Sequence, residues 1–297
     1  MKKFIDTLLL IMIILTGLSL FLYPTVSNYM SEQNGSRAIE DYAENVSGLD
    51  QAASAEELAK AERYNEALYR SSIDAEPTSV SQSDYDYMLN LSGDGMIGYV
   101  DIPRINVRLP IYHGTDGKTL ESYIGHMPSS SLPVGGKGTH TVLSGHRGLP
   151  SARLFTDLDE LEKGDIFFLM ILDETLSYEV DQIRIVLPTE LSDLEIDEEK
   201  DLCTLVTCTP YGINTHRLLV RGHRVENPEE QPVVRVSADA FMIDPVLVAP
   251  LAAVPLILLL LLLLLISSRK GTLHGRALRK AREEQRELEA AYEERNE

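Results

Sequence analysis

Two long apolar segments, one near each end of the 297-residue chain, constrain its fold more than any other feature. The segment 246–266 carries no charge and includes an unbroken run of leucines at 258–265. A run of about 20 apolar residues can cross a membrane as a helix, whereas a core helix of a soluble protein has a polar face. The segment 4–23 follows Lys2 and Lys3 and carries one charge, Asp6. We therefore predict two transmembrane helices.

The N-terminal segment also has features of a cleaved signal peptide, because a short basic start and an apolar run suit both kinds of segment. The apolar run is long for a signal peptide, and no Ala-x-Ala site follows it. Thr25–Ser27 offers only a weak cleavage site. We favour an uncleaved N-terminal anchor over residues 1–23.

The distribution of basic residues predicts the orientation of the two spans. Basic residues flank membrane spans on the cytoplasmic side. Lys2 and Lys3 precede the first span, and six basic residues follow the second span before the first acid: Arg269, Lys270, Arg276, Arg279, Lys280 and Arg282. We therefore predict a cell-membrane protein with both termini in the cytoplasm and residues 24–245 outside the cell.

The segment between the spans is strongly acidic, with 17 Lys and Arg against 38 Asp and Glu over residues 24–245. Such a domain is a poor candidate for binding nucleic acid or anionic lipid headgroups. It tolerates a cationic partner, such as a protein that presents a lysine. The predicted partners therefore include the lipid bilayer and no nucleic acid.

Composition divides the external region into successive parts. Residues 24–70 are rich in Ala, Glu and Leu and predict helix, with a break at Gly48. Residues 71–95 are rich in Ser, Asp and Pro and predict a linker or a long ordered loop. Residues 96–226 have a β pattern, 227–245 form a tether, and 267–297 form a charged tail. About eight short strands indicate a closed barrel or a sandwich, at 97–100, 107–111, 139–144, 166–170, 176–180, 184–186, 202–207 and 217–220.

The two cysteines of the chain have different predicted roles. Cys203 and Cys208 are separated by an odd number of positions on a predicted strand, so their side chains point to opposite faces and a disulfide between them is unfavourable. Cys203 fits a small buried apolar residue. Cys208 ends the apolar strand directly before Pro210–Gly212, which places its thiol next to a loop where a substrate can reach it.

Two further residues complete a predicted catalytic group with Cys208. Arg217 follows Cys208 across a turn, and a hairpin there brings a guanidinium near the thiol, where it can stabilise an oxyanion. His146 lies in a loop at the end of the strand 139–144. A thiolate nucleophile with a histidine acid/base partner supports acyl transfer. Other histidines remain candidates, with His126 the strongest rival: His126, His140, His216 and His223. No metal or cofactor site is predicted.

These residues carry a resemblance to the sortase family. Thr204–Cys208 followed by Arg217 resembles the sortase TLxTC…R signature. Longer stretches resemble class C sortases, the pilin-polymerising enzymes of Gram-positive bacteria, in the order Leu109–Gly114, Leu132–Gly136, Ser144–Pro150, Leu154–Leu158 and Asn214–Arg221. The resemblance covers about residues 40–226.

The resemblance implies an eight-stranded sortase β-barrel and a transpeptidase reaction. An LPXTG-like sorting signal is cleaved between Thr and Gly, a thioester forms on Cys208, and an amine attacks it. In class C enzymes that amine is a lysine of another pilin subunit, so pilin subunits or surface proteins with such a signal are the implied partners. His146, Cys208 and Arg217 match the catalytic positions of the family.

One departure from class C sortases concerns the lid before the barrel. Class C enzymes often carry an Asp-Pro-aromatic lid motif, whereas here Asp74 and Pro77 are separated and no aromatic residue follows directly. Asp74 is therefore a weak candidate for a lid contact to Arg217. Three other functions stay open: a housekeeping-type sortase that anchors proteins to a cell-wall precursor, a hydrolytic cysteine peptidase, and a membrane-tethered binding module without catalysis.

Overall fold

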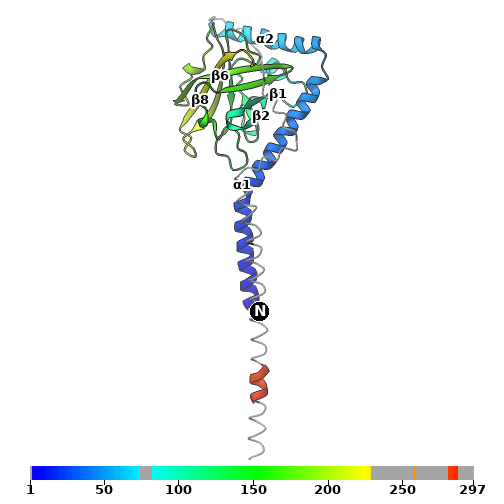
Figure 1. Ribbon diagram of the computed structural model, residues 1–297, viewed down its shortest axis with the longest axis vertical. Helices are drawn as coiled ribbons and strands as arrows, with labels where there is room; N and C mark the ends of the chain where they lie inside the picture. The colour runs from blue at the N-terminus through cyan, green and yellow to red at the C-terminus, as the bar shows by residue number, and fades with distance from the viewer. Residues whose placement is uncertain (1, 74–81, 229–256, 258–279, 287–297) are drawn as a thin grey trace, which may run out of the picture. The chain divides into compact units, whose positions relative to one another are not determined.

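The computed structural model describes residues 2–73, 82–228, 257 and 280–286 (Figure 1). The chain divides into two units, Met1–Thr25 with Val236–Glu297, and Val26–Arg235. The predicted second span at 246–266 apart from Ile257, most of the tether and the proposed lid residue Asp74 lie outside the described residues.

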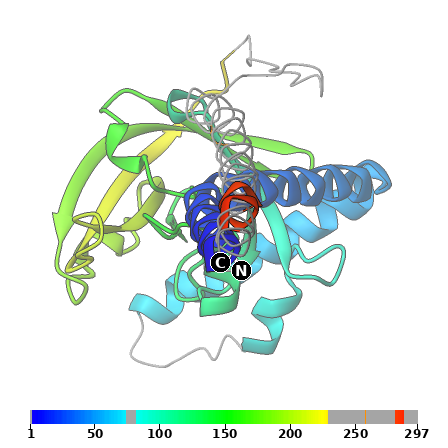
Figure 2. The same cartoon turned by 90° about the horizontal axis from the view of Figure 1, so that it is seen from below.

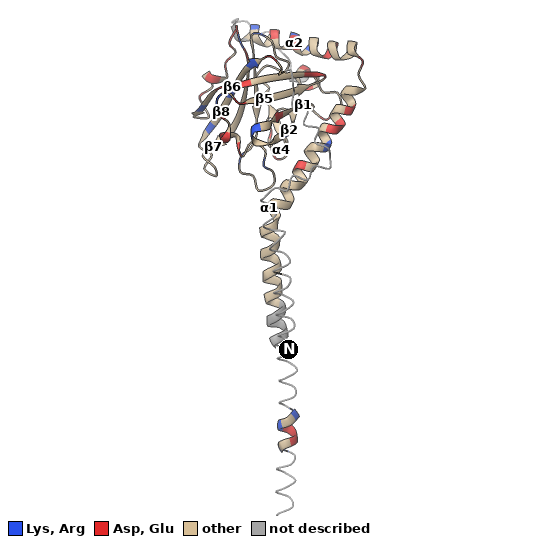
Figure 3. Ribbon diagram, viewed as in Figure 1, with Lys and Arg blue, Asp and Glu red and all other residues tan. Residues whose placement is uncertain are grey.

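The N-terminal helix α1, Lys2–Ser47, confirms the first predicted span as a helix that is long and apolar enough to cross a membrane, with a mean hydropathy of 2.2 over its most apolar 18 residues. Figure 3 shows no charged side chain along the described lower part of this helix, and the sequence carries no charge from residue 7 to 31. Large apolar side chains on this part are exposed, namely Leu9, Leu10, Met12, Ile13, Leu15, Leu20 and Phe21. A lipid environment removes these side chains from water.

A closed barrel of eight strands forms the centre of the second unit, as predicted, in the order β1-β2-β3-β4-β7-β8-β6-β5. Most neighbours are antiparallel, whereas β2 with β3 and β4 with β7 are parallel. The strands are β1 Met96–Ile102, β2 Val107–His113, β3 Ile124–His126, β4 Thr139–Ser144, β5 Ile166–Ile171, β6 Glu174–Val186, β7 Asp201–Thr209 and β8 His216–Val225. The short helices between strands are η1 Pro103–Ile105, α4 Gly117–Leu120, η2 Leu158–Glu160 and η3 Ser192–Leu194.

Two details of the predicted strand pattern were wrong. The segments 176–180 and 184–186 belong to one strand, β6, which continues through a bulge between Val180 and Gln182. The polar residues at the bulge have the composition of a turn, although the strand pairs with β8 on both sides of it. The strand β3 was missed, because three residues, Ile124–His126, carry no recognisable alternation.

The side chains of each strand alternate between the barrel interior and its outer face. On β7, Cys203 and Leu205 belong to the main core, and on β8 Leu218 and Val220 do the same. Residues at the intervening positions of β7 and β8 therefore point outward. This alternation decides which side chains reach the candidate site.

Helices α1 and α2 contact the barrel through specific polar groups. The helix α1 ends at Ser47 and α2, Gln51–Ile73, begins just beyond it, which confirms the predicted break at Gly48. The buried hydroxyl of Tyr42 accepts from the Leu172 N–H at 2.8 Å and donates to the Ile97 carbonyl at 3.1 Å. Asn65 of α2 exchanges two hydrogen bonds with the backbone of Leu132. Figure 2 shows α2 beside the barrel.

The segment 71–95 contains more structure than its composition predicts. The helix α2 extends to Ile73, and a short helix α3, Gln82–Tyr87, follows the undescribed residues 74–81. The side chains of Tyr85 and Leu89 are fully buried against the barrel. These two apolar contacts supply the burial that a Ser- and Asp-rich stretch otherwise lacks.

Candidate active site

Cys208 lies near the end of β7 on the outer face of the barrel. The antiparallel register pairs Cys208 with Arg217 of β8 directly. Residues opposite each other in an antiparallel pair have side chains on the same face, about 5 Å apart at Cβ. Cys208 is partly exposed and Cys203 is buried, and both are free thiols. The different faces predicted for the two cysteines are therefore confirmed.

The guanidinium of Arg217 is held by backbone carbonyls. Its Nη1 donates to the carbonyls of Asn214 at 3.4 Å and His216 at 3.2 Å. Among the described residues no carboxylate forms an ion pair with Arg217. The positive charge beside Cys208 is thus not neutralised within this part of the chain, and it can stabilise an oxyanion that develops there.

His146 follows β4 and is fixed relative to β7 through its neighbour Gly145. The Gly145 N–H donates to the Val206 carbonyl at 3.0 Å, and the hydroxyl of Thr207 donates to the Gly145 carbonyl at 2.8 Å. These bonds continue the parallel register in which Ser144 pairs with Val206. The loop that carries His146 therefore leaves the sheet beside the end of β7 that carries Cys208.

Gly145 leaves no room for a side chain at this junction. A Cβ atom there would lie 2.7 Å from Cδ2 of Phe155 and 2.9 Å from Cγ2 of Ile124. Both neighbours are fully buried and cannot move aside without disturbing the core. The close packing of this glycine sets the point at which the His146 loop begins.

The rival His126 is a buried structural residue. Its Nε2 donates to the Ser131 carbonyl at 2.8 Å, so its Nδ1 accepts from the hydroxyl of Tyr85 at 2.8 Å. Burial and, to a smaller extent, the nearby His113 lower the pKa of His126 to about 4, against the opposing effect of the hydrogen bond to Ser131. With both ring nitrogens occupied in the core, His126 is not available to a substrate.

The remaining predicted rivals also lie away from the Cys208 thiol. His140 donates from Nδ1 to the Glu195 carbonyl and accepts at Nε2 from Thr204, and burial lowers its pKa. His223 pairs with Leu202, six residues before Cys208 on β7, or roughly 20 Å along the strand. His216 precedes Arg217, so its side chain points to the opposite face of β8.

An apolar patch, buried beneath neighbouring side chains, lies beside Cys208 on the outer face of the barrel, and the sequence did not predict it. Its four residues come from β4, β6, β7 and β8, and Leu194 of the β6–β7 loop packs on it: Val142, Val186, Val206 and Leu219. Val206 and Leu219 lie two residues from Cys208 and Arg217 on the same face.

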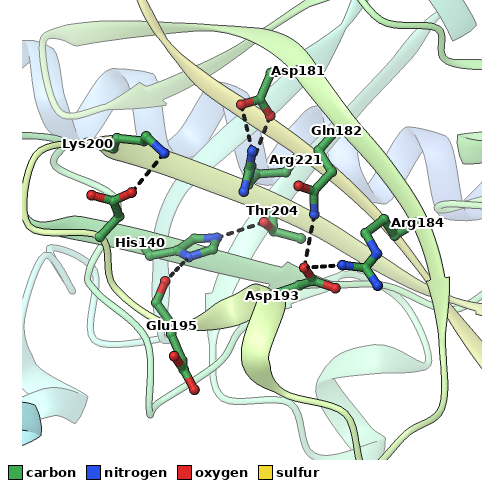
Figure 4. A network of polar contacts seen from close by, with 10 residues as sticks. His140, Asp181, Gln182, Arg184, Asp193, Glu195, Lys200, Thr204 and Arg221 are labelled. Carbon is green, nitrogen blue, oxygen red and sulfur yellow. Dashed lines mark hydrogen bonds and ion pairs between the residues drawn. The ribbon is translucent and has the colours of Figure 1, made fainter.

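Polar contacts fix the β6–β7 loop next to this patch (Figure 4). Asp193 accepts from Arg184 at 2.9 Å and from Gln182 at 3.2 Å, both on β6. His140 of β4 holds the Glu195 carbonyl of the same loop at 2.8 Å. The loop therefore forms a wall of the outer face near the candidate site. Within the described ranges, no group of three or more His, Cys, Asp or Glu is arranged to hold a metal ion.

Comparison with known proteins assigns the chain to a family. The Sortase domain matches residues 100–225 of the chain. Sortase D of Bacillus subtilis (strain 168) is 36% identical over 131 residues, which cover 43% of this chain and 63% of that protein. The crystal structure of sortase C1 from Streptococcus agalactiae is 52% identical with a TM-score of 0.61 and covers 65% of this chain and 100% of that chain. The chain belongs to the sortase family.

The resemblance to class C sortases is also confirmed among the solved structures. Besides sortase C1, a structure of Clostridium perfringens sortase C with the C-terminal cell wall sorting motif is 42% identical with a TM-score of 0.57. It covers 65% of this chain and 100% of that chain. The chain spans less than two thirds of the length of the curated sortase D, 63%.

Proposed function

We propose that the chain is a cysteine transpeptidase with Cys208 as nucleophile, His146 as acid/base partner and Arg217 as electrostatic stabiliser. The observation that carries this proposal is the direct pairing of Cys208 with Arg217 across β7 and β8. Because Gly145 is hydrogen-bonded to β7, the loop that carries His146 begins at the same edge of the barrel. Sortase relatives and a partly exposed thiol support the assignment.

The proposed reaction has two acyl-transfer steps. The thiolate of Cys208 attacks the scissile carbonyl, and the guanidinium of Arg217 stabilises the resulting oxyanion. The imidazolium of His146 gives its proton to the leaving amine as the C–N bond breaks, which leaves a thioester on Cys208. An incoming amine then attacks the thioester, the imidazole of His146 takes its proton, and the new amide forms as the thiolate leaves.

The proposed donor substrate is an LPXTG-like sorting signal cleaved between Thr and Gly. The similar Clostridium perfringens sortase C was solved with a C-terminal cell wall sorting motif. The proposed acceptor is a pilin lysine, which makes the product an isopeptide bond of a covalent pilus.

A direct test uses the full chain in detergent with a sorting-signal peptide and a candidate pilin. The variants Cys208→Ala, His146→Ala and Arg217→Gln should lose the crosslinked product, measured by mass spectrometry, by about 10²-fold or more. Cys203→Ala is the matched control and should keep the product. If Cys208→Ala still forms the product, Cys208 is not the nucleophile and the proposal fails. If the wild type forms no product, a binding module remains.

The identity of the acceptor is tested by the same reaction. A crosslink through a pilin lysine supports polymerisation, whereas transfer only to the amine of a cell-wall precursor supports a housekeeping-type sortase. Release of the free acid even with excess amine identifies a hydrolytic peptidase instead.

The proposed location is the cell membrane, with two spans, cytoplasmic termini and an external barrel. The apolar part of α1 supports the first span. Protease added to intact cells should remove the barrel and spare tags at both termini. A C-terminal tag that is digested in intact cells would contradict the two-span topology.

A further inference from the structure

Arg147, the residue after His146, is buried between the two loops of the candidate site. Its guanidinium Nη2 pairs with Asp159 at 2.6 Å, and its side chain is only 12% exposed. Its Nε is buried and has no hydrogen-bond partner among the described residues. An arginine that is almost fully buried is costly unless it serves a specific contact. A surface ion pair would not require this burial.

The segment that carries Asp159, the partner of Arg147, is anchored in the core, whereas the side chain of Asp159 is 48% exposed. Asp159 lies in η2, next to Leu158, whose side chain is fully buried in the main core. The same segment holds the His146 loop through its backbone, because the Phe155 N–H donates to the His146 carbonyl at 3.1 Å. The Gly148 N–H donates to the hydroxyl of Thr156 at 3.1 Å. Residues 155–159 thus support one side of the loop.

Tyr211 supports the other side of the loop and comes from the Cys208 segment. The guanidinium carbon of Arg147 lies 5.9 Å from the centre of the Tyr211 ring, within range of a cation–π contact. The ring also packs on the backbone of Gly148, where a Cβ atom would lie 2.8 Å from Cε2 of Tyr211. Gly148 has φ +74°, a left-handed conformation that favours glycine. Tyr211 follows Cys208 by three residues, so this contact joins the two loops directly.

We propose that Arg147 is a positioning residue that, together with Asp159 and Tyr211, holds the imidazole of His146 beside Cys208. The proposal rests on the proposed function, because it takes His146 and Cys208 as the reacting groups. It assigns no reacting atom to Arg147. Displacement of a catalytic group by about 1 Å can lower the rate on the order of 100-fold. The contacts of Arg147 with Asp159 and Tyr211 therefore affect the transfer step more than substrate binding.

The test compares kinetics of transpeptidation by the full chain in detergent across pH. Arg147→Met should lower kcat by about 10- to 100-fold with little change in KM. The pH profile of Cys208 alkylation should move toward that of the His146→Ala variant. Arg147→Lys should recover part of kcat, because lysine keeps the charge but cannot stack as a planar group.

Tyr211, the second partner of Arg147, gives an independent variant that leaves the Arg147–Asp159 ion pair in place. Tyr211 is 60% exposed, so Tyr211→Leu should fold normally and still lower kcat, whereas Tyr211→Phe should keep it because the ring remains. Arg147→Met combined with Tyr211→Leu should lower kcat no more than Arg147→Met alone, as expected for residues that act as one unit. If Arg147→Met does not fold, Tyr211→Leu decides the question.

The matched control is Arg108→Met, which removes an arginine–aspartate pair with Asp101 on β1 and β2, two strands that border neither β4 nor β7. It should leave kcat and the alkylation profile unchanged. The inference is wrong if Arg147→Met and Tyr211→Leu both retain the wild-type kcat and pH profile while His146→Ala and Cys208→Ala are inactive. If instead His146→Ala and Cys208→Ala remain active, it is the proposed function that fails.

Discussion

At the scale of single residues, the two thiols differ in reactivity because they lie on opposite faces of β7. Cys203 is fully buried, and burial raises the pKa of its thiol, whereas Cys208 is partly exposed. A neutral maleimide should therefore label one thiol per native chain, counted by mass spectrometry, and a second only after unfolding. Cys203→Ala should keep the rapid label and Cys208→Ala should abolish it. Equal labelling of the native Cys208→Ala variant would contradict the burial of Cys203.

His126 makes the stability of the barrel depend on pH. Its pKa is about 4 in the folded chain and near 6.5 when unfolded, so the unfolded state binds more protons between these values. Its contribution to stability is complete above pH 6.5 and is lost as the pH falls toward 4, on the order of 3 kcal/mol. Urea unfolding between pH 7 and 4.5 measures this loss.

The His126→Gln variant should be less stable at pH 7, because Tyr85 and Ser131 lose their imidazole partner. Its stability should also depend less steeply on pH than that of the wild type. His216→Gln, near the barrel rim, is the control and should retain the wild-type slope. An unchanged slope in His126→Gln would assign the acid sensitivity to other groups.

The sequence was sufficient to propose three site residues but not the residues that position them. Cys208 and Arg217 are separated by a recognisable turn, so their pairing follows from local hairpin geometry. His146 could be separated from His126 only by burial, which depends on tertiary packing. The contact of Arg147 with Tyr211 joins distant loops, and nothing in either local pattern predicts it.

At the scale of elements, the count of eight strands was right although two boundaries were wrong. One long strand, β6, was divided at its bulge, and the three-residue β3 was missed. A signal for β3 exists in Gly125, because a Cβ there would lie 2.0 Å from the Gly114 carbonyl oxygen. Such a close backbone approach requires glycine, but only the folded structure shows which backbone approaches.

The attachment of α1 to the barrel depends on the hydroxyl of Tyr42. Tyr42→Phe removes its bonds to Leu172 and Ile97 and leaves the buried Leu172 N–H without a partner. We expect a loss of about 1–3 kcal/mol in the free energy of unfolding, measured with urea. Tyr87→Phe is the control, because Tyr87 is 79% exposed on the neighbouring α3. Equal stability of both variants would show that the Tyr42 hydroxyl does not stabilise the helix on the barrel.

At the scale of the whole molecule, the net charge of the chain affects the proposed donor and the proposed acceptor differently. The chain has a formal net charge of −19, with the acidic excess between the predicted spans. An apolar sorting signal gains little from this field, whereas a lysine-bearing acceptor is attracted to it. The second step of the proposed reaction is therefore the one that the net charge accelerates.

Salt should consequently slow transfer to a cationic acceptor more than transfer to a neutral one. Raising the ionic strength from about 0.02 M to about 0.5 M shortens the screening length severalfold. We expect kcat/KM for a lysine-bearing acceptor to fall on the order of 10-fold, with a much smaller change for hydroxylamine, which is neutral at pH 7. Stopped assays with the same sorting-signal peptide give both values. Because the two acceptors attack the same thioester, an equal salt dependence would place the salt effect on the first step and would remove electrostatic steering from the choice of acceptor.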